Sequence, residues 1–98
     1  MEEYFPTVVQ AVAGSERTVY AYFSDGAIRR FDVAPMIRAG SVFERLREDS
    51  FFRDAITVLN GTVAWDVSGH FDPASCIDLD PFTLYDAEVV SDPLEEAG

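Results

Sequence analysis

The stretch TVYAYFSDGAIRRFDV, residues 18–33, decides the fold class of this chain. It holds two runs of β-branched and aromatic residues, a composition typical of β-strands, on either side of Asp25-Gly26. An Asp-Gly pair between such runs is a strong hairpin signal, because both residues tolerate the positive φ of a two-residue turn. We therefore expect an antiparallel hairpin with strands over 18–24 and 27–33.

A two-residue loop would set the register of this hairpin, with Phe23 opposite Ile28 and Tyr22 opposite Arg29. Both faces of the sheet would then carry apolar side chains, which is more than a sheet with one wet face needs. Either the sheet curls around its own core or one face is an interface. Aromatic and arginine side chains of one face could form cation–π pairs and serve as an interface. The candidate interface residues are Tyr20, Tyr22, Arg29 and Phe31.

Helical signals lie in the middle of the chain. Ser41 and Glu44 have the form of a capping box, which predicts a helix over 42–48. Beyond Asp49-Ser50, aromatic and aliphatic residues repeat at i,i+4, which predicts a second short helical stretch.

Strand and turn signals surround this middle part. Residues 7–13 are β-branched and alternating, and Asn60-Gly61 marks a second two-residue hairpin. A last short strand is expected over 77–79, after which Asp80-Pro81 reads as an N-cap with proline at the first helical position. The sequence thus predicts an α+β fold, a small antiparallel sheet of about five or six short strands with one or two short helices packed against it.

Length and composition favour one folded domain. The chain has 98 residues, of which 48% are hydrophobic, enough for one compact core but not for two. We expect a single domain over residues 1–90, followed by an acidic, mobile tail over 91–98.

The charge of the chain is strongly one-sided. Eighteen Asp and Glu face seven Arg and no Lys, a net charge of −11. Such a field repels phosphate, so we expect neither direct nucleic-acid binding nor binding to an anionic membrane. It suits cationic partners or metal ions, or it is a solvated surface that keeps the protein soluble.

Compartment signals point to the cytoplasm. The start Met1-Glu2-Glu3 is acidic where a signal peptide is positive, and no apolar run is long enough to cross a membrane. A single cysteine, Cys76, cannot form an internal disulfide, which fits a reducing compartment.

One segment mixes side chains that bind metals or small ligands, between Trp65 and Asp80. Its spacing matches neither a Cys-x-x-Cys zinc pair nor a calcium-binding loop, so no metal and no cofactor are expected. Turn chemistry explains Asp72 and Asp80, each followed by proline, and Trp65 also fits a core position. The ligand-binding candidates are Trp65, Asp66, His70, Asp72, Asp78 and Asp80, and among them His70, Asp72 and Asp78 are the weak metal candidates.

Catalytic motifs are missing. The chain has neither a Gly-x-Ser-x-Gly nucleophile elbow nor a glycine-rich phosphate loop. A pair of carboxylates can always be found among eighteen acids, so it discriminates nothing. We therefore expect a protein that is not an enzyme.

Several motifs in order resemble a known family. They are Asp25-Gly26 leading to Phe31-Asp32-Val33, the run Phe43-Glu44-Arg45-Leu46, and Trp65 followed by Ile77-Asp78-Leu79-Asp80-Pro81 and Leu84-Tyr85. Together they resemble the small bacterial domain of unknown function numbered 2442, over Val8 to Tyr85, in the branch with a longer segment after the tryptophan. The resemblance implies a small α+β accessory or interaction domain, in some cases one member of a toxin–antitoxin-like pair, and brings no catalytic residues.

Two functional hypotheses follow. The first is a cytoplasmic interaction module, antitoxin-like in its most specific form, that binds another protein or itself through the hairpin face. The second is a small-ligand or metal-binding domain that uses the Asp66 to Asp80 loop.

Overall fold

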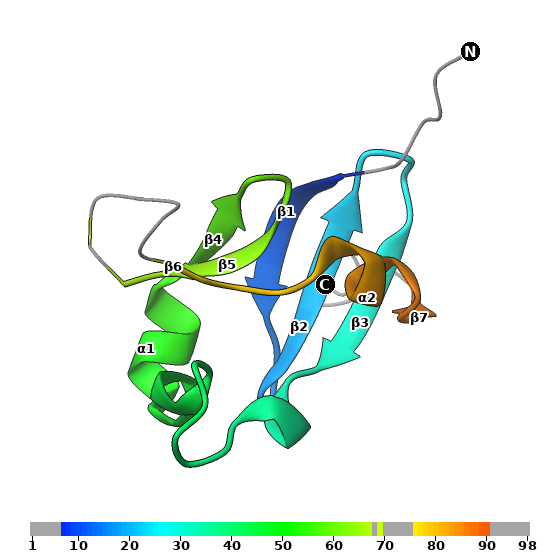
Figure 1. Cartoon of the computed structure of the whole chain (residues 1–98). Coiled ribbons are helices and arrows are strands. Elements are labelled where there is room, and N and C mark those ends of the chain that lie inside the picture. The colour runs from blue at the N-terminus through cyan, green and yellow to red at the C-terminus, as the bar shows by residue number, and fades with distance from the viewer. Residues whose placement is uncertain (1–6, 68, 70–75, 91–98) are drawn as a thin grey trace.

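The computed structural model describes residues 7–67, 69 and 76–90. The expected acidic tail over 91–98 lies outside these residues. Within them the α+β prediction is confirmed, with strands, two short α-helices and two 3₁₀ turns (Figure 1). The elements are β1 (Val8–Ala13), β2 (Thr18–Phe23), β3 (Ile28–Asp32), η1 (Ala34–Met36), η2 (Glu44–Arg47), α1 (Asp49–Asp54), β4 (Ile56–Leu59), β5 (Thr62–Asp66), β6 (Cys76–Asp78), α2 (Pro81–Tyr85) and β7 (Glu88–Val89).

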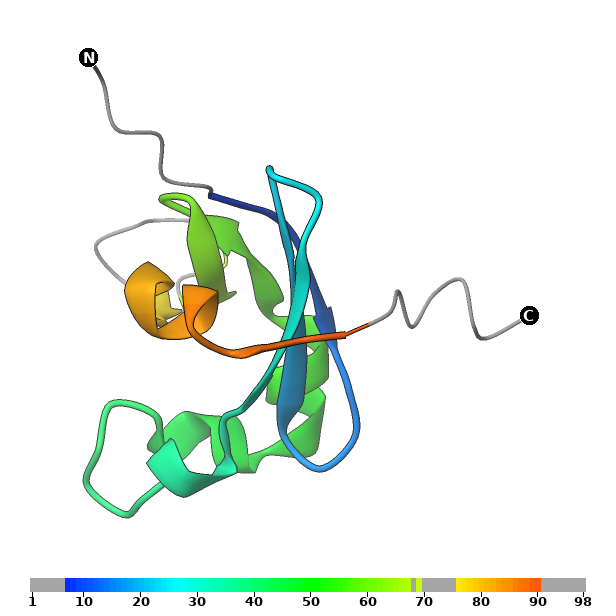
Figure 2. The ribbon, with the colours of Figure 1, turned by 90° about the vertical axis from the view of Figure 1, so that its right-hand side faces the viewer.

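Two antiparallel sheets replace the one that the sequence predicts. The first has the order β1-β2-β3-β7 and the second the order β4-β5-β6. Strand β1 packs against β4 and β5, and the Val8 N–H donates a 2.9 Å hydrogen bond to the Gly61 carbonyl oxygen. The second sheet and α2 lie against one face of the first sheet (Figures 1 and 2). The buried core takes its side chains from both sheets.

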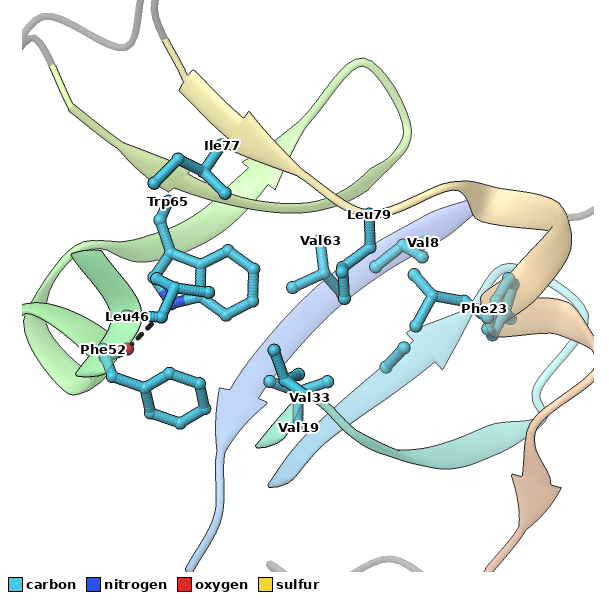
Figure 3. Packing of buried hydrophobic residues seen from close by; sticks show 12 residues of the cluster. Val8, Val19, Phe23, Val33, Leu46, Phe52, Val63, Trp65, Ile77 and Leu79 are labelled. Atoms are coloured by element: carbon cyan, nitrogen blue, oxygen red, sulfur yellow. Dashed lines mark hydrogen bonds between the residues drawn. The ribbon is translucent and has the colours of Figure 1, made fainter. Parts of the chain in front are cut away.

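Trp65 lies at the centre of this core with 0% of its surface exposed. Its indole Nε1 donates a 2.9 Å hydrogen bond to the Phe52 carbonyl oxygen near the end of α1, which gives a buried polar atom a partner (Figure 3). The core is thus shared by both sheets and the helical segments. Its buried members are Val8, Val19, Ala21, Phe23, Val33, Leu46, Phe52, Val63, Trp65, Ile77, Leu79 and Leu84.

The predicted register of the first hairpin is wrong by one residue. Tyr22 pairs with Ile28 rather than with Arg29. The loop has three residues, because the Gly26 N–H donates to the Phe23 carbonyl oxygen at 3.0 Å and the Phe23 N–H donates to the Ala27 carbonyl oxygen at 2.8 Å. With φ +92° at Gly26, this is a turn closed by a glycine bulge, the common three-residue alternative. A slip of one residue moves every side chain of one strand to the other face.

The second hairpin confirms its prediction. Leu59 pairs with Thr62, so the loop is Asn60-Gly61 alone. Both loop residues have positive φ, +55° and +75°, as the two-residue turn requires.

The helical predictions are confirmed in position and corrected in length. In place of a helix over 42–48 there is the four-residue 3₁₀ helix η2. The Ser41 hydroxyl accepts a hydrogen bond from the Phe43 N–H at 3.2 Å, and the Glu44 carboxylate accepts one from the Gly40 N–H at 3.0 Å. These bonds fix the bend before η2 rather than extend a helix.

The last helix begins as predicted, and one strand was missed. Asp80 caps α2, because its carboxylate accepts a 3.0 Å hydrogen bond from the Phe82 N–H. Strand β7, two residues long and paired with β3, has too short a pattern to be found in the sequence. Among the described residues, no helix has the length and apolar character needed to cross a membrane.

Candidate functional site

The face of the first sheet that points away from the core is the first candidate surface, here called the outer face. Side chains that oppose one another in an antiparallel pair share a face, so the register defines it. The second sheet and α2 lie on the other side (Figure 2). The outer face carries Gln10, Val12, Thr18, Tyr20, Tyr22, Ile28, Arg30, Asp32 and Glu88.

Tyr20 is held in place on the outer face by a close approach to Gly14. A methyl group added at Gly14 would lie 2.8 Å from Cε2 of Tyr20 and 3.3 Å from the Thr18 carbonyl oxygen. The ring therefore covers a backbone position that only glycine leaves open. Tyr20 is only half-buried, so the rest of its surface faces solvent.

Arg30 and Glu88 on the outer face form an ion pair, whereas Asp32 on the same face forms none within the described residues. Arg30 Nη2 donates a 2.8 Å hydrogen bond to the Glu88 carboxylate. The pKa of Arg30 is raised above its ordinary value, first by this hydrogen bond and the charge of Glu88 and then, in smaller part, by Tyr20. Asp32, at the end of β3, accepts a 3.1 Å hydrogen bond from the Ala34 N–H. The middle of the face is thus electrically balanced.

The four predicted interface residues do not share one face. Tyr20 and Tyr22 lie on the outer face, whereas Arg29 and Phe31 pair with Ala21 and Val19 and lie on the inner side. The corrected register puts Ile28 and Arg30 beside the tyrosines instead.

Arg29 contributes to the fold. Its guanidinium lies 4.4 Å from the centroid of the Tyr85 ring, and its Nη1 donates a 2.7 Å hydrogen bond to the Ala87 carbonyl oxygen. These contacts join β3 to α2 and to the segment that leads into β7.

The predicted ligand segment is dispersed in its described part. Trp65 is a core residue, Asp80 caps α2, and Asp78 lies exposed on β6. The Asp66 carboxylate accepts a 3.2 Å hydrogen bond from the Gly69 N–H. No group of three potential metal ligands occurs among the described residues. Two predicted residues lie outside them: His70 and Asp72.

A second surface is concave, and we call it the acid-rimmed groove. It consists of two adjoining hollows, one of about 700 Å³ beside η2 and β6 and one of about 500 Å³ beside α1 and β4, which share Arg45 and Val67. No local sequence pattern indicates this groove, because its walls come from four separate segments, residues 41–48, 51–57, 66–69 and 77. The acids of the groove are Glu44, Glu48, Asp54 and Asp66.

The described residues define a small α+β domain with two packed antiparallel sheets, an open sheet face and a groove. The chain belongs to the family described as "Protein of unknown function (DUF2442)", which matches residues 8–89. No curated protein and no solved structure matches the chain.

Proposed function

We propose that this domain is a non-enzymatic interaction module that self-associates through its outer face. The observation that carries the proposal is that no described element covers this face, although Tyr20, Tyr22 and Ile28 lie half-buried on it. Sheets normally cover such a face with another layer. Tyrosine suits a surface that is wet in one state and buried in another, because its ring is apolar and its hydroxyl is polar.

Charge favours a second copy as the occupant. With a net charge of −11, two copies repel each other wherever their acids meet. Arg30 and Glu88 neutralise each other on the outer face, so these two charges add no net repulsion there. In a two-fold interface each copy presents the same patch, and Arg30 of one copy can pair with Glu88 of the other.

The test is the mass of the particle in solution, measured by light scattering over a range of concentrations. The variant Tyr22→Thr with Ile28→Thr removes the cross-strand apolar pair of the outer face that lies nearest the hairpin loop, and it keeps residues compatible with a strand. The matched control is Val42→Thr with Val67→Thr, since these exposed valines lie in the groove. At a concentration at which the variant has the mass of one chain, wild type and control should have twice that mass. A wild type that stays monomeric at every concentration would contradict the proposal.

The family resemblance adds a finer form of this proposal. The module would work in the cytoplasm as the accessory or antitoxin-like partner of a second protein. The dimer would then present two copies of any further binding surface, one on each chain.

A further inference from the structure

The acid-rimmed groove lies apart from the outer face and shares no residue with it. We infer that it binds a basic amphipathic segment of a partner protein, one that carries both Lys or Arg side chains and apolar side chains. The inference is independent of self-association, because it uses other residues and other contacts.

The charge of the groove indicates that the partner segment is positively charged. Four acids and one base line the two hollows, a difference of 4 − 1, or three net negative charges. Within the described residues, Glu48 and Asp54 form no ion pair with an arginine. Carboxylates around a concave surface attract cations and speed their approach, and they exclude an acidic partner.

Apolar side chains lie beside these acids, so the partner segment should carry apolar side chains as well as positive charge. Val42 is 74% exposed and Val67 is 37% exposed, and both line the larger hollow together with Ile77. A metal ion or another small cation would use the acids and leave the valines in water. A segment that carries both charge and apolar side chains buries the valines as well, which adds a hydrophobic contribution to binding.

Arg45 lies where the two hollows meet, and its positive charge predicts whether its removal strengthens or weakens binding. Its guanidinium is 4.4 Å from the centroid of the Phe51 ring, and within the described residues it forms no ion pair. It thus occupies the ring face that a partner cation could use, and it repels that cation. Removal of this charge should strengthen binding.

The probe is a fluorescent peptide made of Leu and Lys in a helical pattern, about four turns long. Two comparison peptides test the apolar contact and the positive charge separately. One has Gln in place of each Leu, and the other has Glu in place of each Lys. Wild type should bind the Leu–Lys peptide, bind the Gln–Lys peptide more weakly, and not bind the Leu–Glu peptide. Fluorescence anisotropy at low salt gives the dissociation constants.

Charge variants locate the site. Glu48→Gln with Asp54→Asn should weaken Leu–Lys binding about five- to tenfold, since each lost charge contact contributes modestly. Its control, Asp25→Asn with Asp86→Asn, removes the same charge outside both hollows and should change binding by less than about twofold.

Arginine and apolar variants complete the design. Arg45→Gln should strengthen Leu–Lys binding about threefold, whereas Arg47→Gln, on the same short helix and outside the hollows, should have a smaller effect. Val42→Thr with Val67→Thr should weaken binding, and Tyr22→Thr with Ile28→Thr on the outer face should not.

Each contrary result overturns the inference. Equal losses in the groove and remote charge pairs would mean that only the overall charge attracts the peptide. Equal binding of the Leu–Lys and Gln–Lys peptides would remove the apolar contact. These outcomes leave the light-scattering test of self-association untouched, so the two proposals can fail separately.

Discussion

The Arg29 guanidinium stacks on the Tyr85 ring, with its central carbon 4.4 Å from the ring centroid. The Tyr85 hydroxyl donates a 3.3 Å hydrogen bond to Asp25 in the hairpin loop, and Phe23 meets the same ring edge-on at 5.4 Å. Arg29 forms no ion pair within the described residues, and its buried Nε has no hydrogen-bond acceptor there. The contacts of Arg29 therefore attach α2 to the hairpin without a carboxylate partner.

Two neighbouring arginines should differ in their effect on stability. Arg29→Met should lower the free energy of unfolding by about 1–2 kcal/mol, because it removes a partly desolvated cation–π contact and the bond to the Ala87 carbonyl oxygen. Arg30→Met breaks an exposed ion pair, so little or no measurable change is expected. Urea denaturation of both variants checks the difference. Equal losses of unfolding free energy would contradict the register that places the two side chains on opposite faces of β3.

The position of Arg29 shows what the sequence could not predict, namely the length of the hairpin loop before it. Asp25-Gly26 and Asn60-Gly61 are equivalent signals, yet the first lies in a three-residue loop and the second is a two-residue loop. Both loops need glycine at positive φ, so residue type does not choose between them. Since side chains alternate along a strand, that one-residue difference moved Arg29 from the predicted interface to the inner side.

A helix cap and one of the two hairpin turns were predictable from local chemistry, and long-range contacts were not. The Asp80 cap and the Asn60-Gly61 turn depend on residues within two or three positions, and both were found in the sequence. The groove depends on η2, α1, β5 and β6 meeting in space, which no local pattern encodes. Trp65 fitted both a core position and a ligand site, and its full burial decides for the core.

Trp65→Phe should cost about 3 kcal/mol of folding free energy. The change removes the buried hydrogen bond to the Phe52 carbonyl oxygen and leaves a small cavity beside Phe52, whose ring lies 5.5 Å from the tryptophan. Tyr85→Phe, which loses the exposed 3.3 Å hydrogen bond to Asp25, is the control and should cost less than about 0.5 kcal/mol. Chemical denaturation measures both. A small loss for Trp65→Phe would show that the indole N–H is easily replaced.

Asn60 offers a test of the second hairpin. Its φ is +55°, which asparagine and glycine tolerate better than other residues. Asn60→Ala should therefore destabilise the protein by about 1 kcal/mol, whereas Asn60→Gly should be nearly neutral. Thermal unfolding of the two variants gives the comparison. If alanine were as good as glycine, the turn would have to change type without loss of stability.

Gly14 and Tyr20 should be energetically coupled. Gly14→Ala puts a methyl group 2.8 Å from Cε2 of Tyr20, so either the ring or the backbone must shift, and overpacking of this kind costs about 1–3 kcal/mol. In a Tyr20→Ser background the ring is gone and only the 3.3 Å approach to the Thr18 carbonyl oxygen remains, so the same change should cost less. A double-mutant cycle by urea denaturation gives the coupling energy, which should exceed about 0.5 kcal/mol. A coupling energy of zero would mean that the ring moves aside freely and that Tyr20 is not held in place on the outer face.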